Sequence, residues 1–487
     1  MAMQEDRRKE EYMQDFDRSR GMFCNRTLNL GAIRAIGYDM DYTLIHYRME
    51  AWEQRAYEYL KESAEAEGWP VGELAFDSRL AMRGLVIDTE HGNVVKANRF
   101  GYVKRAFHGV RPLDFDAQRN LYQRTLVDLS DPRWYFLNTL FSISEACLYM
   151  QLVDLLDGGR LTGCMGYEEL FRRVRRASDD AHMEGRLKAE IIGDPEHFVD
   201  LDADMPLALL DQKQAGKKIL LVTNSEWAYT RPMLSYAFDR FLQGGQTWRD
   251  IFDIAIAGAG KPRFFSFSMP AFEVVGEEGL LRRHRGLLTS EHVYTGGNAS
   301  LVEESLGLRG EEILYVGDHI FVDVNVSKSI LRWRTALVVR ELEEEMAVIE
   351  SFRDRQEDLS RMMEKKAELE NRYSSVRLEL QRIRRGYGPE RGRTAGEIER
   401  SMTNLHHLLD ELDTRIAPVA QAAGELLNPN WGLLMRTGSD KSHLARQIER
   451  YADVYTSRVS NFLHVTPFAF LRSHRGSLPH DPAGSLY

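Results

Sequence analysis

The stretch Gly37–Tyr47, GYDMDYTLIHY, decides the fold because it ends a short apolar run with two aspartates one residue apart. Asp39 and Asp41 each raise the free-energy cost of ionising the other, so their pairing needs a reason. One reason is catalysis, and the other is a capped turn after a buried strand. The rest of the chain decides between these two readings.

Further short apolar runs also end in polar residues. They are continuous rather than alternating and rich in β-branched or aromatic residues, which is typical of strands buried on both faces of a parallel sheet. Helical stretches separate them, so we predict a doubly wound α/β domain. The runs are AIGYD (35–39), KKILLVTNS (217–225), IFDIAIAGAGK (251–261), EILYVGDH (312–319) and RTALVVREL (334–342).

The polar residues at these strand ends form a set that fits phosphate-ester chemistry. In doubly wound sheets, ligands bind at the carboxyl ends of the strands. A phosphate monoester is an anion, and Mg²⁺ can bridge carboxylates and a phosphate oxygen. The sequence therefore predicts a Mg²⁺-dependent phosphate site. Its members are Asp39 and Asp41, Thr223, Asn224 and Ser225, Lys261, and Asp318 with Asp323.

Each residue type has a role in that reaction. Asp39 can attack phosphorus to form an aspartyl-phosphate, and Asp41 can protonate the leaving oxygen and then deprotonate water. Lys261 and Thr223 can bind the equatorial oxygens, where the transition-state charge is spread.

The chain is long enough for several domains. We expect a first segment with the nucleophile strand (1–51), an inserted and mainly helical specificity domain (52–201), and the rest of the core (202–340). The stretch 341–427 reads as two long helices broken at GYGPERGRT, for which we favour an interaction or packing role, and 428–487 is expected to pack on the core.

Composition indicates a cytoplasmic protein that binds neither nucleic acid nor membrane. Lys and Arg number 64 against 74 Asp and Glu, a net charge of -10, which argues against a dedicated nucleic-acid binder. The three cysteines have no disulfide or zinc spacing, and the charged N-terminus lacks a secretory apolar segment. The most membrane-like stretch, Trp134–Leu156, carries Asn138, Glu145, Gln151 and Asp154, each costly in hydrocarbon, and is expected to be a buried helix.

The motifs resemble a known family. DMDYTL, LVTNS, AGAGKP and YVGDHIFVD are similar to the four motifs of the haloacid dehalogenase superfamily of phosphohydrolases. RGLVIDTEHGNVVK, TNSEWAYT, KPRFF, YTGGNASLVEESLG and ERYADVYTS are similar to the cytosolic purine 5′-nucleotidases that prefer IMP and GMP. The resemblance implies that Mg²⁺ is held by Asp39, the Asp41 carbonyl and Asp318, with Asp323 in support. Thr223, Asn224 and Lys261 would hold phosphate.

We expect the residues that recognise the substrate base to lie in one stretch of the insertion, FRRVRRASDDAHMEGRLK. Arg175, Asp179 and His182 share one helical face, and the residues alone favour an exposed ion pair of little energetic value. The resemblance instead places them, with Lys188, Phe141 and Ser142, at nucleotide-binding positions. A carboxylate at Asp179 can accept the N1–H of hypoxanthine or guanine, which adenine lacks, so IMP and GMP are expected over AMP, with deoxy forms tolerated.

The resemblance implies three further properties. The phosphoryl group can pass to a nucleoside as well as to water, and the protein forms a homodimer or homotetramer. Asn138, Phe321 and Arg450 match positions linked to an activating nucleotide site, although Asp128 and Ser329 depart from the basic residues expected nearby.

Two other readings remain open at this stage. A different phosphorylated substrate, such as a sugar phosphate or phosphoprotein, would make Phe141, Arg175 and Asp179 dispensable. A catalytically silent scaffold would act through the helices of 341–427, and the intact acid and lysine set argues against it.

Overall fold

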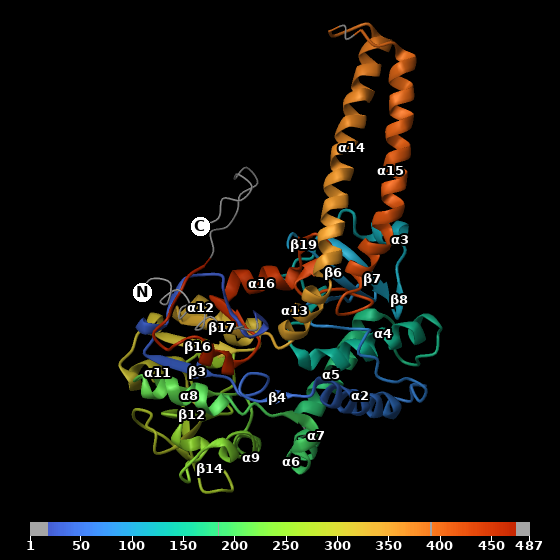
Figure 1. The fold of residues 1–487 in the computed structure, drawn as a ribbon. Helices are drawn as coiled ribbons and strands as arrows, with labels where there is room; N and C mark the ends of the chain where they lie inside the picture. The colour runs from blue at the N-terminus through green and yellow to red at the C-terminus, as the bar shows by residue number, and fades with distance from the viewer. Residues whose placement is uncertain (1–17, 184, 390–391, 474–487) are drawn as a thin grey trace, which may run out of the picture. The chain divides into compact units, whose positions relative to one another are not determined.

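The computed structural model of the chain describes residues 18–183, 185–389 and 392–473, except for the side chains of residues 182 and 183. The chain divides into two compact units. The first comprises Met1–Glu343 with Leu434–Tyr487, and the second comprises Glu344–Leu433. Figure 1 gives the course of the chain through both.

A large sheet forms the centre of the first unit and confirms the predicted doubly wound architecture. Seven neighbouring strands run parallel, and β3, which precedes Asp39, lies between β16 and β11. In order, the described strands are β1 (Met22–Cys24), β20 (Val454–Thr456), β17 (Arg334–Val338), β16 (Ile313–Gly317), β3 (Ala35–Tyr38), β11 (Lys218–Val222), β12 (Ile254–Ala257), β15 (Val293–Gly296), β13 (Ala271–Val275) and β14 (Leu280–Arg283).

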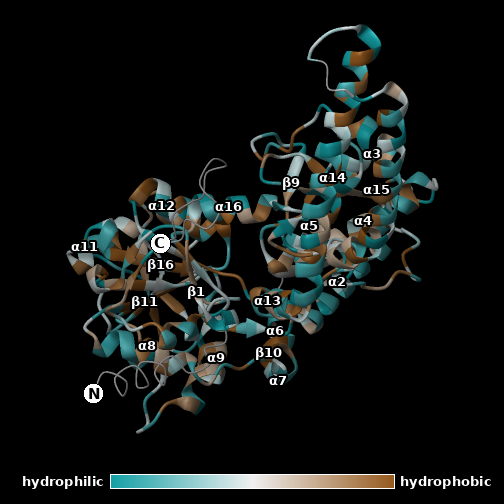
Figure 2. Cartoon of the chain, turned by 45° about the horizontal axis from the view of Figure 1, so that its top comes forward, coloured by the Kyte–Doolittle hydropathy of each residue, from teal (hydrophilic) through white to brown (hydrophobic). Residues whose placement is uncertain are grey.

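Helices cover both faces of this sheet, which explains why its central strands are continuously apolar. Every residue of β3, β12 and β16 is buried. In Figure 2 the helices α8 (Met205–Gln214) and α9 (Trp227–Phe238) lie on one side of the strands. On the other side lie α11 (Ala299–Leu306) and α12 (Val326–Leu331), and the short α10 (Arg263–Ser266) contacts both.

The residues between β3 and β11 contain more sheet than the sequence indicated. Five antiparallel strands pair in the order β8-β7-β6-β5-β9, with bounds Arg111–Pro112, Val103–His108, Asn93–Ala97, Val86–Asp88 and Trp134–Phe136. The helices are α2 (Met49–Ala66), α3 (Phe115–Tyr122), α4 (Ile143–Asp157), α5 (Tyr167–Met183), α6 (Arg186–Gly193) and α7 (Pro195–Phe198). The second half is helical, as expected.

The ends of this insertion pair with each other. Strand β4 (His46–Tyr47) leaves the core and β10 (Val199–Asp200) returns to it, and the two are antiparallel partners. The stretch 134–156 forms β9 and most of the buried helix α4. In the part of the chain that the structure describes, no helix is long and apolar enough to cross a membrane.

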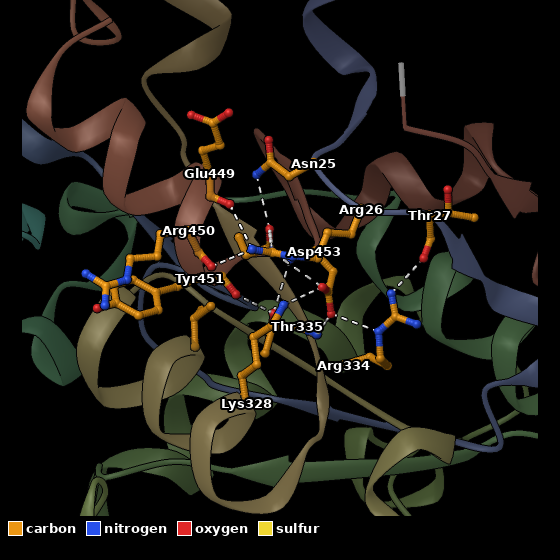
Figure 3. A network of polar contacts seen from close by, with 12 residues as sticks. Asn25, Arg26, Thr27, Lys328, Arg334, Thr335, Glu449, Arg450, Tyr451 and Asp453 are labelled. Carbon is orange, nitrogen blue, oxygen red and sulfur yellow. Dashed lines mark hydrogen bonds and ion pairs between the residues drawn. The ribbon is translucent and has the colours of Figure 1, made fainter. Parts of the chain in front are cut away.

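The C-terminal segment is fastened to the core through Asp453, which is buried between α16 (His443–Tyr451) and β20. Figure 3 shows its carboxylate receiving hydrogen bonds from Lys328, from Arg334 Nε at 2.9 Å and from the backbone of Thr335 at 3.1 Å. Arg26 donates to the carbonyls of Glu449, Arg450 and Ala452 at the end of α16. Burial of an aspartate is tolerated here because several cations and a backbone donor compensate its charge.

The second unit contains a helical hairpin with its own core. Helix α14 (Arg353–Arg385) packs on α15 (Ala395–Gly424), which begins with a capping box between Thr394 and Glu397. The shorter helix α13 (Leu342–Ser351) precedes α14, so the expected single helix is interrupted at Phe352. The hairpin core consists of Leu359, Leu369, Leu405, Leu412 and Ile416.

Candidate active site

The loop after β3 carries the first two acids. The backbone N–H of Asp39 still pairs with β16, donating to Val316 at 2.9 Å, and the chain then turns. The Met40 carbonyl accepts from the N–H groups of Leu44 and Ile45, both at 2.9 Å, and Tyr42 adopts a left-handed φ of 52°. A tight turn directly after a buried strand thus fixes where both carboxylates point.

Lys261 joins Asp39 to the distal acids. Its Nζ lies 2.8 Å from Asp39 Oδ1, 2.7 Å from Asp323 Oδ1 and 3.0 Å from the Tyr315 hydroxyl. Burial works to lower the lysine pKa, but the Asp323 and Asp39 carboxylates outweigh it and raise that pKa well above its usual value. Burial also raises the pKa of Asp39 to about 6, although Lys261 opposes the shift.

Asp39, Asp318 and Asp323 form a buried acidic trio. One carboxylate oxygen of each lies within 4.8 Å of the others. Asp318 Oδ2 is buried without a hydrogen-bond partner among the described residues, and the pKa of this carboxyl is raised well above its usual value by burial and by Asp323 and Asp39. Carboxylate oxygens gathered in this way are the ligands that hard divalent cations take, so these residues fit a metal ion.

Close backbone packing supports the trio. A Cβ on Gly317 would lie 2.5 Å from Asp323 Oδ2, so only glycine allows Asp323 to fold back against β16. Arg83, from the insertion, donates to the Asp318 carbonyl at 3.4 Å and pairs with Glu341 at 2.8 Å. The insertion therefore contacts the backbone of Asp318, one of the three acids that fit a metal ion.

Asp41 is hydrogen-bonded to residues outside that trio. Its Oδ1 accepts from the Tyr47 hydroxyl at 2.5 Å and its Oδ2 from the Ser225 hydroxyl at 2.6 Å. Burial raises the pKa of this carboxyl, against the field of Lys188. The two acids of the opening motif thus lie in different environments, which two carboxylates with different roles require.

The Thr223–Ser225 segment after β11 completes the arrangement. Thr223 Oγ1 accepts from the Ser225 N–H at 3.1 Å, which leaves its hydroxyl proton to donate elsewhere. The Asn224 side chain is used structurally: Oδ1 accepts from the Lys261 N–H at 2.6 Å and Nδ2 donates to the Lys261 carbonyl at 3.0 Å. This amide clamp holds the Lys261 loop beside β11.

The expected base-binding residues fall into two groups. Phe141 lies near the turn after β3, with its ring centroid 4.7 Å from that of Tyr42, and Lys188 donates to Ser225 Oγ at 3.4 Å. Arg175 pairs with Asp179 at 3.1 Å and also with the buried Glu145 at 2.8 Å.

Arg175 is thus held more firmly than an exposed ion pair. The Tyr135 hydroxyl, which also interacts with the buried Ser142, accepts from Arg175 at 2.6 Å. The side chain of His182 lies outside the described residues.

The three possible effector residues surround an aromatic cluster. The Phe321 ring lies 6.0 Å from both Phe136 and Tyr451, and the Arg450 guanidinium lies 5.1 Å from the Tyr451 centroid. Asn138 donates to the Phe136 carbonyl at 3.3 Å, and its Oδ1 is buried with no hydrogen-bond partner in the part of the chain that the structure describes.

Several residues at the site were missed from sequence. Tyr47, Tyr229, Tyr315 and Glu145 all contact predicted site residues, yet none sits in a spacing that marks it. Tyr47 follows Asp41 closely enough to have been a candidate, but a tyrosine in a short apolar run reads first as core. Tyr229, Tyr315 and Glu145 lie close in sequence to the predicted residues, but only the fold shows which of them they contact.

The fold and the site together define the class: an α/β protein with a buried aspartate after the central strand β3, further acids after β16 and a lysine after β12, an arrangement that suits phosphate-ester chemistry. A model of the 5′ nucleotidase family matches residues 22–483, so the chain belongs to that family. It is therefore a phosphoric monoester hydrolase that acts on nucleoside monophosphates.

Comparisons with individual proteins give distant matches. A 5′-nucleotidase domain-containing protein of Dictyostelium discoideum is 26% identical over 476 residues, covering 94% of this chain and 74% of that protein. A predicted phosphoglycolate phosphatase from Haemophilus somnus 129PT matches at 13% identity and a TM-score of 0.27, covering 63% of this chain and 86% of that one. The β-phosphoglucomutase of Pyrococcus sp. strain ST 04 matches at 13% identity and a TM-score of 0.30, covering 63% and 87%.

Proposed function

We propose that this protein hydrolyses purine nucleoside 5′-monophosphates, IMP and GMP with their deoxy forms, in a Mg²⁺-dependent reaction that passes through a phosphorylated Asp39. The observation that carries the proposal is the convergence of Lys261 on Asp39 and Asp323 beside the partnerless Asp318 oxygen. Three buried carboxylates and one ammonium leave excess negative charge, which a divalent cation would neutralise.

The chain's own residues supply the steps. Asp39 attacks phosphorus as the bond to O5′ breaks, and the proton of Asp41 passes to O5′ to release the nucleoside. Water then attacks phosphorus, gives a proton to Asp41 and displaces Asp39. Asp39, Asp318, Asp323 and the Asp41 carbonyl would hold Mg²⁺, which supplies charge neutralisation between carboxylates and phosphate.

Phosphate binding is assigned to the ends of β11 and β12. The Thr223 hydroxyl proton and the Lys261 ammonium are the side-chain donors, with Ser225 bridging to Asp41. Because the Asn224 amide is committed to the Lys261 backbone, we assign its contribution to the backbone N–H. A nucleoside hydroxyl in place of water would give phosphotransfer by the same covalent route.

Base selection is assigned to Asp179 as the acceptor of purine N1–H. Its carboxylate is held by Arg175, which is anchored on Glu145 and Tyr135, so it is oriented before a base arrives. Phe141 would stack on the base, with His182, Lys188 and Ser142 as further contacts. An AMP ring would face this acceptor with its own N1 lone pair, and an acceptor that the bound base shields from water without offering a donor is costly.

Regulation and assembly are proposed on separate observations. The Phe136–Phe321–Tyr451 cluster, with Arg450 and the partnerless Asn138 oxygen, would bind an activating nucleotide. The free thiols of Cys24, Cys147 and Cys164 suit a reducing cytoplasm.

A homo-oligomer is supported by the apolar edge strand β14. Leu280 and Leu281 are 64% and 56% exposed. Antiparallel pairing with a second copy centred on these two residues would set Glu278 opposite Arg283, joining opposite charges across the strands. Leu281→Lys should reduce the mass measured by analytical ultracentrifugation, while the same mass in the variant would remove β14 from the interface.

The test of the proposed function is phosphate release from IMP, GMP and AMP with Mg²⁺ and with EDTA, for the wild type and Asp179→Ala. Metal-dependent release that favours IMP and GMP, with the preference lost in the variant, supports it. The neighbouring exposed acid in Asp180→Ala is the matched control and should keep the preference. Slow, equal release from all three substrates would overturn the purine assignment.

A further inference from the structure

Asp41 is held by a chain of hydroxyl groups that the reaction scheme above does not use. Its Oδ1 accepts from Tyr47, whose hydroxyl oxygen lies 2.9 Å from that of Tyr229. A tyrosine hydroxyl has one proton, and Tyr47 donates its own to Asp41. Tyr229 must therefore donate to Tyr47, which fixes the direction of the whole chain.

Burial makes this chain rigid. Tyr47 is 5% exposed and Tyr229 is 3% exposed, so neither hydroxyl can exchange its partner for bulk water. The ring of Tyr47 is also packed against Tyr42 at 5.3 Å and Trp52 at 4.5 Å. A hydrogen bond between groups that are already immobilised costs little further entropy and holds its acceptor in one orientation.

The two tyrosines come from elements that fix the insertion to the core. Tyr47 lies in β4 and pairs with Val199 of the returning strand β10, whereas Tyr229 lies in α9 of the core. Lys188 of the insertion helix α6 lies with its Nζ 5.1 Å from the Tyr229 ring centroid. The orientation of Asp41 is therefore tied to the place where the insertion joins the core.

We propose that Tyr47, supported by Tyr229, is the positioning residue that turns the Asp41 carboxyl away from the Asp39–Asp318–Asp323 trio and toward the leaving oxygen. The proposal rests on the proposed function, because it assigns a partner to the acid and base of that reaction. Tyr47 acts through Asp41 and exchanges no proton with substrate. Its loss would leave the Asp41 carboxyl held by the Ser225 hydroxyl alone.

This role has a signature that a purely structural role lacks. Release of a nucleoside O5′ needs a proton from Asp41, whereas a thiolate leaves without one. In inosine 5′-phosphorothiolate, sulfur replaces the bridging O5′ and the rest of the substrate is unchanged. A residue that only orients Asp41 should therefore matter for IMP and hardly at all for the sulfur analogue.

The experiment compares single-turnover release of inosine and of 5′-thioinosine by the wild type, Tyr47→Phe, Tyr229→Phe and Tyr42→Phe. Tyr47→Phe should slow the reaction of IMP by about tenfold or more and that of the sulfur analogue by less than about threefold. The difference arises because only the oxygen leaving group of IMP needs a proton from Asp41. Tyr229→Phe should slow the reaction of IMP by a smaller factor and should likewise affect the sulfur analogue less than IMP. Tyr42→Phe is the matched control, since this neighbouring hydroxyl is buried with no hydrogen-bond partner among the described residues.

Equal slowing of both substrates by Tyr47→Phe, or no slowing of either, would overturn the proposal. If Tyr47→Phe does not fold, Tyr229→Phe carries the same comparison, because it removes only the supporting hydrogen bond. Failure of the proposed function looks different: the wild type itself would then release no inosine from IMP, and Asp39→Asn would change nothing.

Discussion

Lys261 Nζ lies 2.7 Å from Asp323 Oδ1, and both side chains are only 1% exposed. The same ammonium reaches Asp39 at 2.8 Å, so one cation holds together acids that follow two different strands. A buried ion pair is weak evidence for stability, but breaking one by removing a single partner is costly because the other charge remains. In the proposed reaction the lysine binds phosphate, and when no phosphate is bound it is the counter-ion of the two carboxylates.

Lys261→Met should therefore lower both activity and stability. We expect the free energy of unfolding in metal-free buffer to fall by about 3–5 kcal/mol, the cost of an uncompensated buried charge, as measured by urea denaturation. The control is Lys217→Met: that buried lysine donates to the carbonyls of Leu30 and Ile33 at 2.6 and 2.7 Å, away from the acids. It should lose stability yet keep kcat, and an equal loss of kcat in both variants would contradict the role of Lys261.

Asp318→Asn should abolish stabilisation by Mg²⁺. A ligand that binds only the folded state at about a hundred times its Kd adds roughly 2.7 kcal/mol, which a thermal scan with and without MgCl₂ detects as a higher Tm. The variant removes a carboxylate oxygen from the trio and should show no such shift. Asp180→Asn, at an exposed acid of α5, should shift as the wild type does; a normal shift in Asp318→Asn would instead place the metal elsewhere.

The sequence predicted that these acids and the lysine lie together, because they follow continuous apolar strands of a parallel sheet. Asp39, Lys261 and Asp318 could be placed at one edge from strand order alone, since the carboxyl ends of parallel strands coincide. Orientation could not be predicted in this way. That Asp41 turns toward Tyr47 and Ser225, and that Asn224 clamps the Lys261 backbone, depends on turn geometry.

The insertion was less predictable for a different reason. Its strands β5 and β6 are wholly buried but only three and five residues long, and runs of that length carry little periodicity. Arg175 and Asp179 were rightly placed on one helical face. Glu145 behind them could not be found, because a glutamate inside an apolar helix pattern gives no sign of the arginine it meets.

Removing the helices α14 and α15 should leave catalysis intact. Every residue of the candidate active site belongs to the unit formed by Met1–Glu343 and Leu434–Tyr487, whereas the hairpin core belongs to the other unit. Replacing residues 353–424 by a short glycine-serine linker should keep kcat/KM for IMP within about threefold, because loop closure costs little free energy. In the full chain, Leu412→Asp should promote proteolysis inside the hairpin alone. If deleting the hairpin abolished the protein's function while Asp39→Asn left it intact, the protein would instead act as a catalytically silent scaffold.

Glu53 should make the protein less stable as the pH rises. It is fully buried in α2 and accepts a hydrogen bond from the Ser144 N–H at 2.7 Å, and within residues 18–183, 185–389 and 392–473 its Oε1 has no hydrogen-bond partner. Burial raises its pKa from 4.5 to about 8, despite the opposing hydrogen bond from Ser144. Below pH 4.5 both states carry the proton, so there is no penalty. Between pH 4.5 and 8 the unfolded state ionises and the folded state does not, and stability falls with pH across this window.

Glu53→Gln should remove that pH dependence, because a neutral amide resembles the protonated acid and still accepts from Ser144. We expect the variant to gain on the order of 3–5 kcal/mol over the wild type between pH 5 and pH 8, measured as the difference in urea unfolding free energy at each pH. Glu58→Gln, on the same helix but 45% exposed and paired with Arg55, should track the wild type throughout. Parallel stability curves for Glu53→Gln and the wild type would mean that Glu53 is ionised in the folded protein, with a cation or water at its Oε1.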